Sequence, residues 1–197
     1  MKRWFVIIGG TILALFVAAG VLVPIMTRPR PLAPFNQPEA LHQAASKLDQ
    51  ARDQLKQGKA VVTLSQSEVR AVLAAGAAQA AGESLQGVDI SLAPGRLQVQ
   101  ANLTTGGRTV SLTIAGEPSV SANALVLHVD EVQVGSLPMP VGTAMRLLAS
   151  QAGGLEVNAE ARTLTIPLSN LQVGGQPVSL ENLTVGQGEL TLDLSTR

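Results

Sequence analysis

LQVQANLTTGGRTVSLTI, residues 97–114, decides the fold of this chain, because apolar and polar side chains alternate along both of its halves. Alternation with a period of two is typical of a β-strand that has one buried face and one solvated face. The Gly106-Gly107 pair between the two halves fits a tight turn. The stretch therefore predicts an antiparallel hairpin with one dry face.

The same alternation continues toward the C-terminus and predicts a long antiparallel meander. Its further apolar positions are Leu125/Leu127/Val129, Leu155/Val157/Ala159, Leu164/Ile166/Leu168, Val178/Leu180, Leu183/Val185 and Leu190/Leu192/Leu194. At Val132 and Val134 the apolar phase shifts by one residue. Such a shift inside a strand predicts a β-bulge near Asp130–Glu131.

The part of the chain before the meander is predicted to be mainly helical. Apolar residues with helical spacing predict an amphipathic helix over residues 39–57, followed by a short strand at Ala60–Leu64. Ser65 and Glu68 match a capping box, in which the serine caps the helix and the glutamate three residues later reaches back to it. This predicts a second, alanine-rich helix that ends near Ala81.

A third short helix is predicted over Val141–Gln151, after Pro138 and Pro140. The fold class that follows is α+β: a curved or rolled antiparallel β-meander packed against two or three helices.

An uninterrupted apolar run from Trp4 to Met26 contains no charged residue. About 20 apolar residues suffice to cross the hydrocarbon core of a bilayer as a helix. Val17-Ala18-Ala19 resembles a signal-peptide cleavage site, but the apolar run continues beyond it, which favours a retained anchor.

The predicted organisation has three parts. Residues 1–27 form a transmembrane signal-anchor, residues 28–38 a proline-rich spacer, and residues 39–197 one α+β domain. The short N-terminal flank is expected in the cytoplasm. The domain is then extracytoplasmic, periplasmic or extracellular, on a single-pass protein of the cytoplasmic membrane.

Composition excludes several classes of function. The chain has no cysteine, which rules out disulfides, lipoprotein anchors and cysteine metal sites. All four aromatic residues lie within the first 35 positions. From residue 36 onward, 10 Lys and Arg stand against 14 Asp and Glu, a net charge of −4. Without stacking platforms or a basic patch, nucleic-acid binding is not expected.

No catalytic or metal centre is predicted, and no cofactor. His128 and Asp130 are two residues apart on one strand, but a metal would need a third ligand from elsewhere. No serine lies in a recognisable nucleophile–base arrangement, and neither a phosphate-binding glycine loop nor an HExxH motif occurs. An enzymatic function is therefore not expected.

Two segments resemble the YpmS-like family of bacterial membrane-anchored extracytoplasmic domains. Val62–Val69, VTLSQSEV, resembles its strand-then-helix opening, and Val132–Pro140, VQVGSLPMP, resembles its Gly-x-Leu-Pro-x-Pro segment before a helix. That family has been linked remotely to tubular lipid-binding proteins. The resemblance implies a rolled sheet that packs against a long helix around an apolar groove.

Two functions follow from these observations. In the first, an aliphatic groove binds a lipid or another apolar ligand; its expected lining is Val72, Leu73, Leu97, Val99, Leu112, Ile114, Leu125, Leu127, Val129 and Met145. In the second, the core is fully packed and the domain is a non-catalytic cell-envelope scaffold that docks a protein partner. Cavity volume separates them, since ligand pockets measure roughly 300–1,000 Å³ and packed cores have few voids larger than a water.

Overall fold

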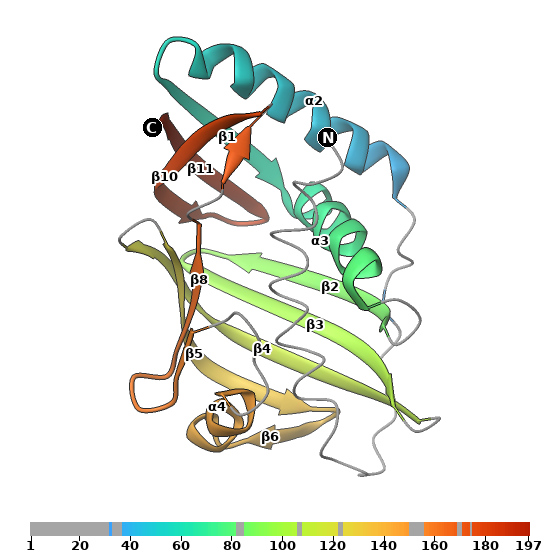
Figure 1. The fold of residues 1–197 in the computed structure, drawn as a ribbon. Helices are drawn as coiled ribbons and strands as arrows, with labels where there is room; N and C mark the ends of the chain where they lie inside the picture. The colour runs from blue at the N-terminus through green and yellow to red at the C-terminus, as the bar shows by residue number, and fades with distance from the viewer. Residues whose placement is uncertain are drawn as a thin grey trace.

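The computed structural model describes residues 32, 37–81, 85–105, 108–121, 124–149, 156–168, 171–173 and 175–197. These residues form two antiparallel sheets and three helices (Figure 1). The larger sheet is curled, as the sequence predicts, and the α+β class is confirmed.

The large sheet has the strand order β2-β3-β4-β5-β8-β7, and β6 pairs with the outer part of β5. Its strands are β2 (Leu85–Ala93), β3 (Arg96–Thr105), β4 (Arg108–Ser121), β5 (Ala124–Val134), β6 (Leu137–Met139), β7 (Glu156–Asn158) and β8 (Thr163–Pro167). The hairpin predicted from residues 97–114 is the β3–β4 pair, in which Val99 lies opposite Ile114. Gly106-Gly107 lies outside the described residues.

The predicted bulge is confirmed in β5. Ala115 pairs with Glu131, but the next residue, Gly116, pairs with Val129, so Asp130 is the extra residue. At this point β4 and β5 approach closely: a Cβ atom on Gly116 would collide with the carbonyl oxygen of His128. Only glycine fits there, which explains its place opposite the bulge.

The C-terminal strands form a separate small sheet instead of extending a single meander. Its order is β1-β11-β10-β9, with β1 (Lys59–Ser65), β9 (Gln172–Val173), β10 (Gln176–Val185) and β11 (Glu189–Thr196). Strand β1 enters this sheet from far away in the sequence, with Val62 opposite Leu192. The turns of the two sheets are joined by backbone hydrogen bonds: Gly95 N–H donates to Val185 O (2.9 Å), and Gly188 N–H donates to Leu92 O (3.0 Å).

All three predicted helices are present, each within a few residues of its expected bounds. They are α2 (Pro38–Leu55), α3 (Gln66–Ala81) and α4 (Val141–Ala149). Helix α2 lies across the small sheet and contacts α3, which packs against β1 and β2. Helix α4 packs at the other end of the molecule, against β5 and β7 (Figure 1).

None of the three helices in the described ranges is both long and apolar enough to cross a bilayer. The span predicted at Trp4–Met26 lies outside the described residues. It stays a prediction.

Candidate functional site

An apolar cavity lies between the two sheets. The small sheet contributes Leu64, Leu180, Leu183, Leu190, Leu192 and Leu194, and the large sheet contributes Ile90, Leu97, Pro118, Leu125 and Ile166. Strand pairing explains the first group: Leu64 lies opposite Leu190, and Leu183 opposite Leu192, so their side chains share one face of the small sheet.

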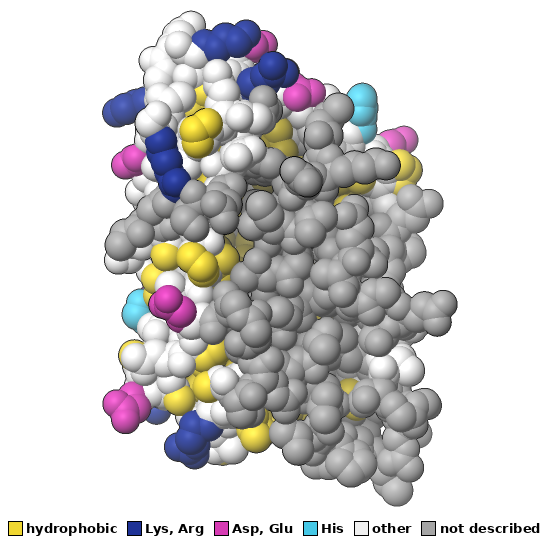
Figure 2. All heavy atoms as spheres, in the orientation of Figure 1, with side chains coloured by type: hydrophobic (Ala, Val, Ile, Leu, Met, Phe, Trp, Pro, Cys, Tyr) yellow, Lys and Arg dark blue, Asp and Glu magenta, His cyan; other side chains and the backbone are white. Residues whose placement is uncertain are grey.

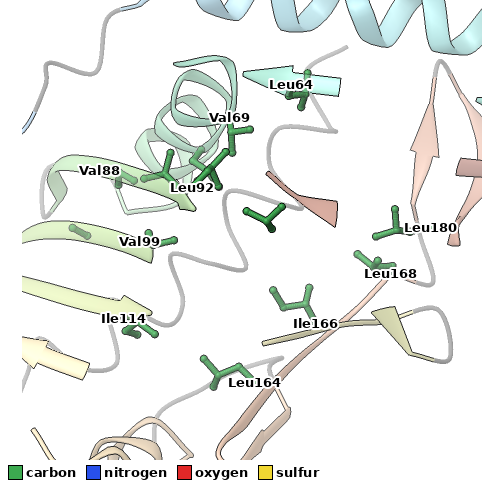
Figure 3. Close-up of a cluster of buried hydrophobic side chains, with 14 of the residues drawn as sticks. Leu64, Val69, Val88, Leu92, Val99, Ile114, Leu164, Ile166, Leu168 and Leu180 are labelled. Carbon is green, nitrogen blue, oxygen red and sulfur yellow. The ribbon is translucent and has the colours of Figure 1, made fainter. Parts of the chain in front are cut away.

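Helices and a connecting segment complete the wall. Leu48 comes from α2, Val69, Val72 and Leu73 come from α3, and Leu168 and Leu171 come from the segment between β8 and β9. Figure 3 shows Leu64, Val69, Ile166, Leu168 and Leu180 around the same region, from α3, from both sheets and from that segment. The cavity therefore joins the parts of the fold that are most distant in sequence.

The lining is chemically uniform. Among the described residues, every lining residue is leucine, isoleucine, valine or proline. A polar or charged group placed inside would lose its hydrogen bonds to water and find no side-chain partner there, at a cost of several kcal/mol. The cavity is thus suited to hydrocarbon and unsuited to phosphate, sugar or carboxylate groups.

The cavity has a volume of about 130 Å³. This is far larger than a packing void, yet below the roughly 300–1,000 Å³ of pockets that enclose a drug-sized ligand. A cavity of roughly 150 Å³ lined by leucine, isoleucine and phenylalanine stays dry and binds benzene. The volume therefore fits a short hydrocarbon segment and not a whole lipid molecule.

Part of the wall reaches the surface. Leu97, Leu125, Leu183, Leu190 and Leu192 are only half-buried, whereas Ile90 and Leu73 are almost completely enclosed. Figure 2 shows hydrophobic side chains at mid-height of one face of the molecule, below a group of Lys and Arg side chains near its top. These five leucines, together with Leu48, Val72 and Pro118, are the half-buried part of the lining.

The structure brings four of the ten expected lining residues to the cavity: Val72, Leu73, Leu97 and Leu125. The other six are Val99, Leu112, Ile114, Leu127, Val129 and Met145, and none of them lines it. Leu127 is half-buried, and the remaining five are buried in the core.

Sequence reasoning missed the small-sheet half of the cavity. The alternation of Leu190, Leu192 and Leu194 predicts a strand, but it carries no information on which sheet that strand joins. The pairing of β11 with β1 brings these leucines opposite the large sheet. The sequence signal available was the concentration of leucine, without β-branched residues, at the apolar positions of β11.

A buried polar network holds the two helices that line the cavity. Glu68 is 2 % exposed, and its carboxylate accepts hydrogen bonds from Lys47 Nζ (2.8 Å) and from the Ser65 backbone N–H (2.6 Å). The Glu68 N–H donates to Ser65 Oγ (3.3 Å), which confirms the predicted capping box. Lys47 Nζ also donates to Thr63 O (2.9 Å).

Burial alone would raise the pKa of Glu68, but the hydrogen bonds from Lys47 and Ser65 and the positive charge of Lys47 outweigh it, so the pKa lies below its usual 4.5. The carboxylate is therefore charged at neutral pH and links α2, β1 and α3. Leu48 and Val69, the sequence neighbours of Lys47 and Glu68, both line the cavity. This network thus fixes the helical wall.

His128 and Asp130 are both exposed, and Asp130 forms an ion pair with Arg96, whose guanidinium also binds Glu131 (2.8 Å). Within the described ranges, no group of three His, Asp or Glu side chains could hold a metal ion. The structure therefore gives His128 and Asp130 no third ligand there.

Comparison of the chain with models of known protein families, with curated proteins and with solved structures gave no match. The YpmS-like resemblance therefore stays a prediction.

Proposed function

We propose that residues 39–197 form an extracytoplasmic domain, held at the cytoplasmic membrane by residues 1–27, that binds the hydrocarbon part of a lipid between its two sheets. The observation that carries the proposal is the cavity whose described lining is entirely aliphatic. Apolar groups gain about 25 cal/mol per Å² of surface removed from water, so hydrocarbon is the ligand such a lining favours.

The source of the ligand follows from the predicted anchor. A domain tethered beside a bilayer meets acyl chains at high local concentration. The cavity accepts one end of such a chain, and its volume of about 130 Å³ limits how much of the chain is enclosed. The proposal assigns no chemical reaction to the domain.

The test is whether lipid stays with the protein when it leaves the membrane. The full chain is extracted from membranes in a mild detergent, exchanged into a detergent with a distinct mass, and examined by native mass spectrometry. We expect a bound species with the mass of a membrane lipid. Recovery of the folded protein without lipid, at every detergent concentration, would favour the scaffold function instead.

Two matched variants connect the binding to this cavity. Ile90 lines it and Ile114 does not, although both lie on the same face of the large sheet and both are opposite Val99. In Ile90→Phe the larger side chain fills part of the cavity, so we expect the lipid to be lost. Folded Ile114→Phe should retain it. Equal lipid content in the two variants would place the binding elsewhere.

A further inference from the structure

Leu32 lies against the large sheet at Gly87. A Cβ atom on Gly87 would lie 3.2 Å from both Cβ and Cδ1 of Leu32. Gly87 is buried, and Leu32 is half-buried. Because side chains alternate along a strand, position 87 faces away from the side that carries Val88 and Ile90. Leu32 is therefore seated on the face of the sheet opposite the cavity.

This face is polar in sequence but buried in the structure. Gly87 pairs with Asn102, and Asn102 pairs with Ser111. Asn102 is 7 % exposed, Ser111 is 1 % exposed, and Ser111 Oγ donates to Asn102 Oδ1 (2.5 Å). The outer face of an antiparallel sheet commonly faces water. At Gly87, Asn102 and Ser111, however, this face is buried and packed.

We infer that Leu32 is a docking point between the proline-rich spacer and the domain, with Gly87 as its seat, and that this contact holds the β2 edge of the large sheet close to the bilayer. The second half of the inference rests on the proposed membrane span. The partner surface is the lipid headgroup region next to that span.

The number of residues between the predicted span and Leu32 limits the distance between them. Leu32 is six residues beyond Met26, the last residue of the predicted span. A fully extended chain covers at most about 3.6 Å per residue, so Leu32 lies within about 22 Å of the end of the span. Ile90, which lines the cavity, is three residues beyond Gly87 on β2, or about 10 Å along the strand. Docking at Leu32 thus keeps the cavity near the membrane that supplies its ligand.

The absence of native cysteine makes the docking directly testable by a disulfide. The Cβ separation of 3.2 Å is slightly shorter than the 3.5–4.5 Å of disulfides, so a small shift permits the bond. We expect the full-length double variant Leu32→Cys/Gly87→Cys, in membranes, to form an intramolecular disulfide at least about ten-fold faster than the control Leu32→Cys/Gly142→Cys. No atom lies within 4 Å of a Cβ placed on Gly142.

Equal rates in the two double variants would overturn the docking. If Gly87→Cys does not fold, a diazirine amino acid at position 32 replaces the disulfide. Photocrosslinks to residues 86–88, located by mass spectrometry, then support the docking, and crosslinks confined to other segments overturn it.

The orientation is tested by energy transfer from a dye on the full chain to an acceptor on lipid headgroups, in phosphatidylcholine vesicles. The dye is placed at one of two positions. Gln86→Cys lies at the start of β2. Lys56→Cys follows the end of α2, on the opposite side of the molecule (Figure 1). We expect clearly higher transfer from position 86. Equal transfer would overturn the orientation.

Carbonate extraction of the wild-type chain tests the anchor separately: release would refute the proposed span without affecting the disulfide.

Discussion

The side chains that line the cavity and a second group of core side chains are equally apolar but differ in how completely they are packed. The first group, the cavity half, consists of the lining residues defined above and includes half-buried leucines such as Leu97 and Leu183. The second group, the packed half, consists of Leu112, Ile114, Val129, Met145 and Leu148, each no more than 4 % exposed and none at the cavity.

This difference shows that an apolar sequence pattern does not determine whether the side chains pack completely or leave a cavity. The packed half comes from the neighbouring strands β4 and β5 and from α4, which contacts β5. The cavity half is assembled from two separate sheets, which contact each other through β10 and β4, through β11 and β2, and through hydrogen bonds at their turns. Protein interiors are normally close-packed, but the side chains that face one another between these two sheets leave about 130 Å³ unfilled.

The largest expected effect comes from a charge in each half. Leu112→Asp places a carboxylate in the packed half without a partner, so we expect a loss of about 4 kcal/mol or more in the free energy of unfolding. Leu125→Asp lies on the half-buried part of the cavity wall, where water can reach it, and should cost less than about 2 kcal/mol. Urea unfolding followed by circular dichroism measures both. Equal losses would show that the cavity half is as tightly packed as the rest.

A smaller difference in stability between the two halves is expected when an isoleucine in each is enlarged to phenylalanine. Ile114→Phe must push neighbouring side chains apart, which typically costs about 1–3 kcal/mol. Ile90→Phe extends into existing space, so its cost should be under about 1 kcal/mol, or it should stabilise the lipid-free protein. Thermal unfolding of the two delipidated variants is the measurement. A greater loss for Ile90→Phe would contradict the cavity.

The parts of the fold that sequence predicted are those decided by neighbouring residues. The two-residue period of residues 97–114, the phase shift at Asp130, and the Ser65–Glu68 pair each act over a few positions, and each is confirmed. Helix bounds followed from the same local signals. These features required no knowledge of which segments meet in space.

The parts that sequence missed depend on distant partners. Nothing local in β1 indicates that it pairs with β11, so the small sheet and the leucine side chains that it brings to the cavity were not foreseen. The pairing of Lys47 with Glu68 was not foreseen either, because the two residues belong to different helices. Four expected lining residues reached the cavity because they lie on apolar faces, but an apolar face does not tell where packing is incomplete.

The polar network at Glu68 supports the cavity half, so we expect a pH-dependent contribution to stability from this half. Because its pKa is lowered in the folded protein, the stability contributed by Glu68 is fully present above its unfolded pKa of about 4.5 and is lost as pH falls through the lower folded value. Glu68→Gln should remove this part of the pH dependence. At pH 7 it should also lower the free energy of unfolding by about 1–2 kcal/mol, since charged hydrogen bonds are lost.

The control is Glu117→Gln, because Glu117 is exposed and, among the described residues, takes part in no comparable buried network. Unfolding curves between pH 3 and pH 7 compare the two. Hydrogen exchange shows where the loss falls: α2 and α3, on the cavity wall, should become less protected while α4 does not change. Uniform loss of protection would mean that Glu68 supports the whole domain and not the cavity half in particular.

The smallest expected effect concerns the bulge in β5, the strand that contributes Leu125 to the cavity half and Val129 to the packed half. Leu125, at the cavity, precedes the bulge at Asp130, and Val132, in the core, follows it. Arg96 binds the carboxylates of the bulge residue Asp130 and of its neighbour Glu131, but its side chain is 38 % exposed, so solvent screens the ion pairs. We expect Arg96→Gln to cost no more than about 1 kcal/mol, and the difference from wild type to disappear at high salt. Arg146→Gln on α4 is the matched control and should show no salt-dependent difference. A loss of several kcal/mol in Arg96→Gln that persists in high salt would mean that the guanidinium, and not the close approach of Gly116 to His128, sets the register between β4 and β5.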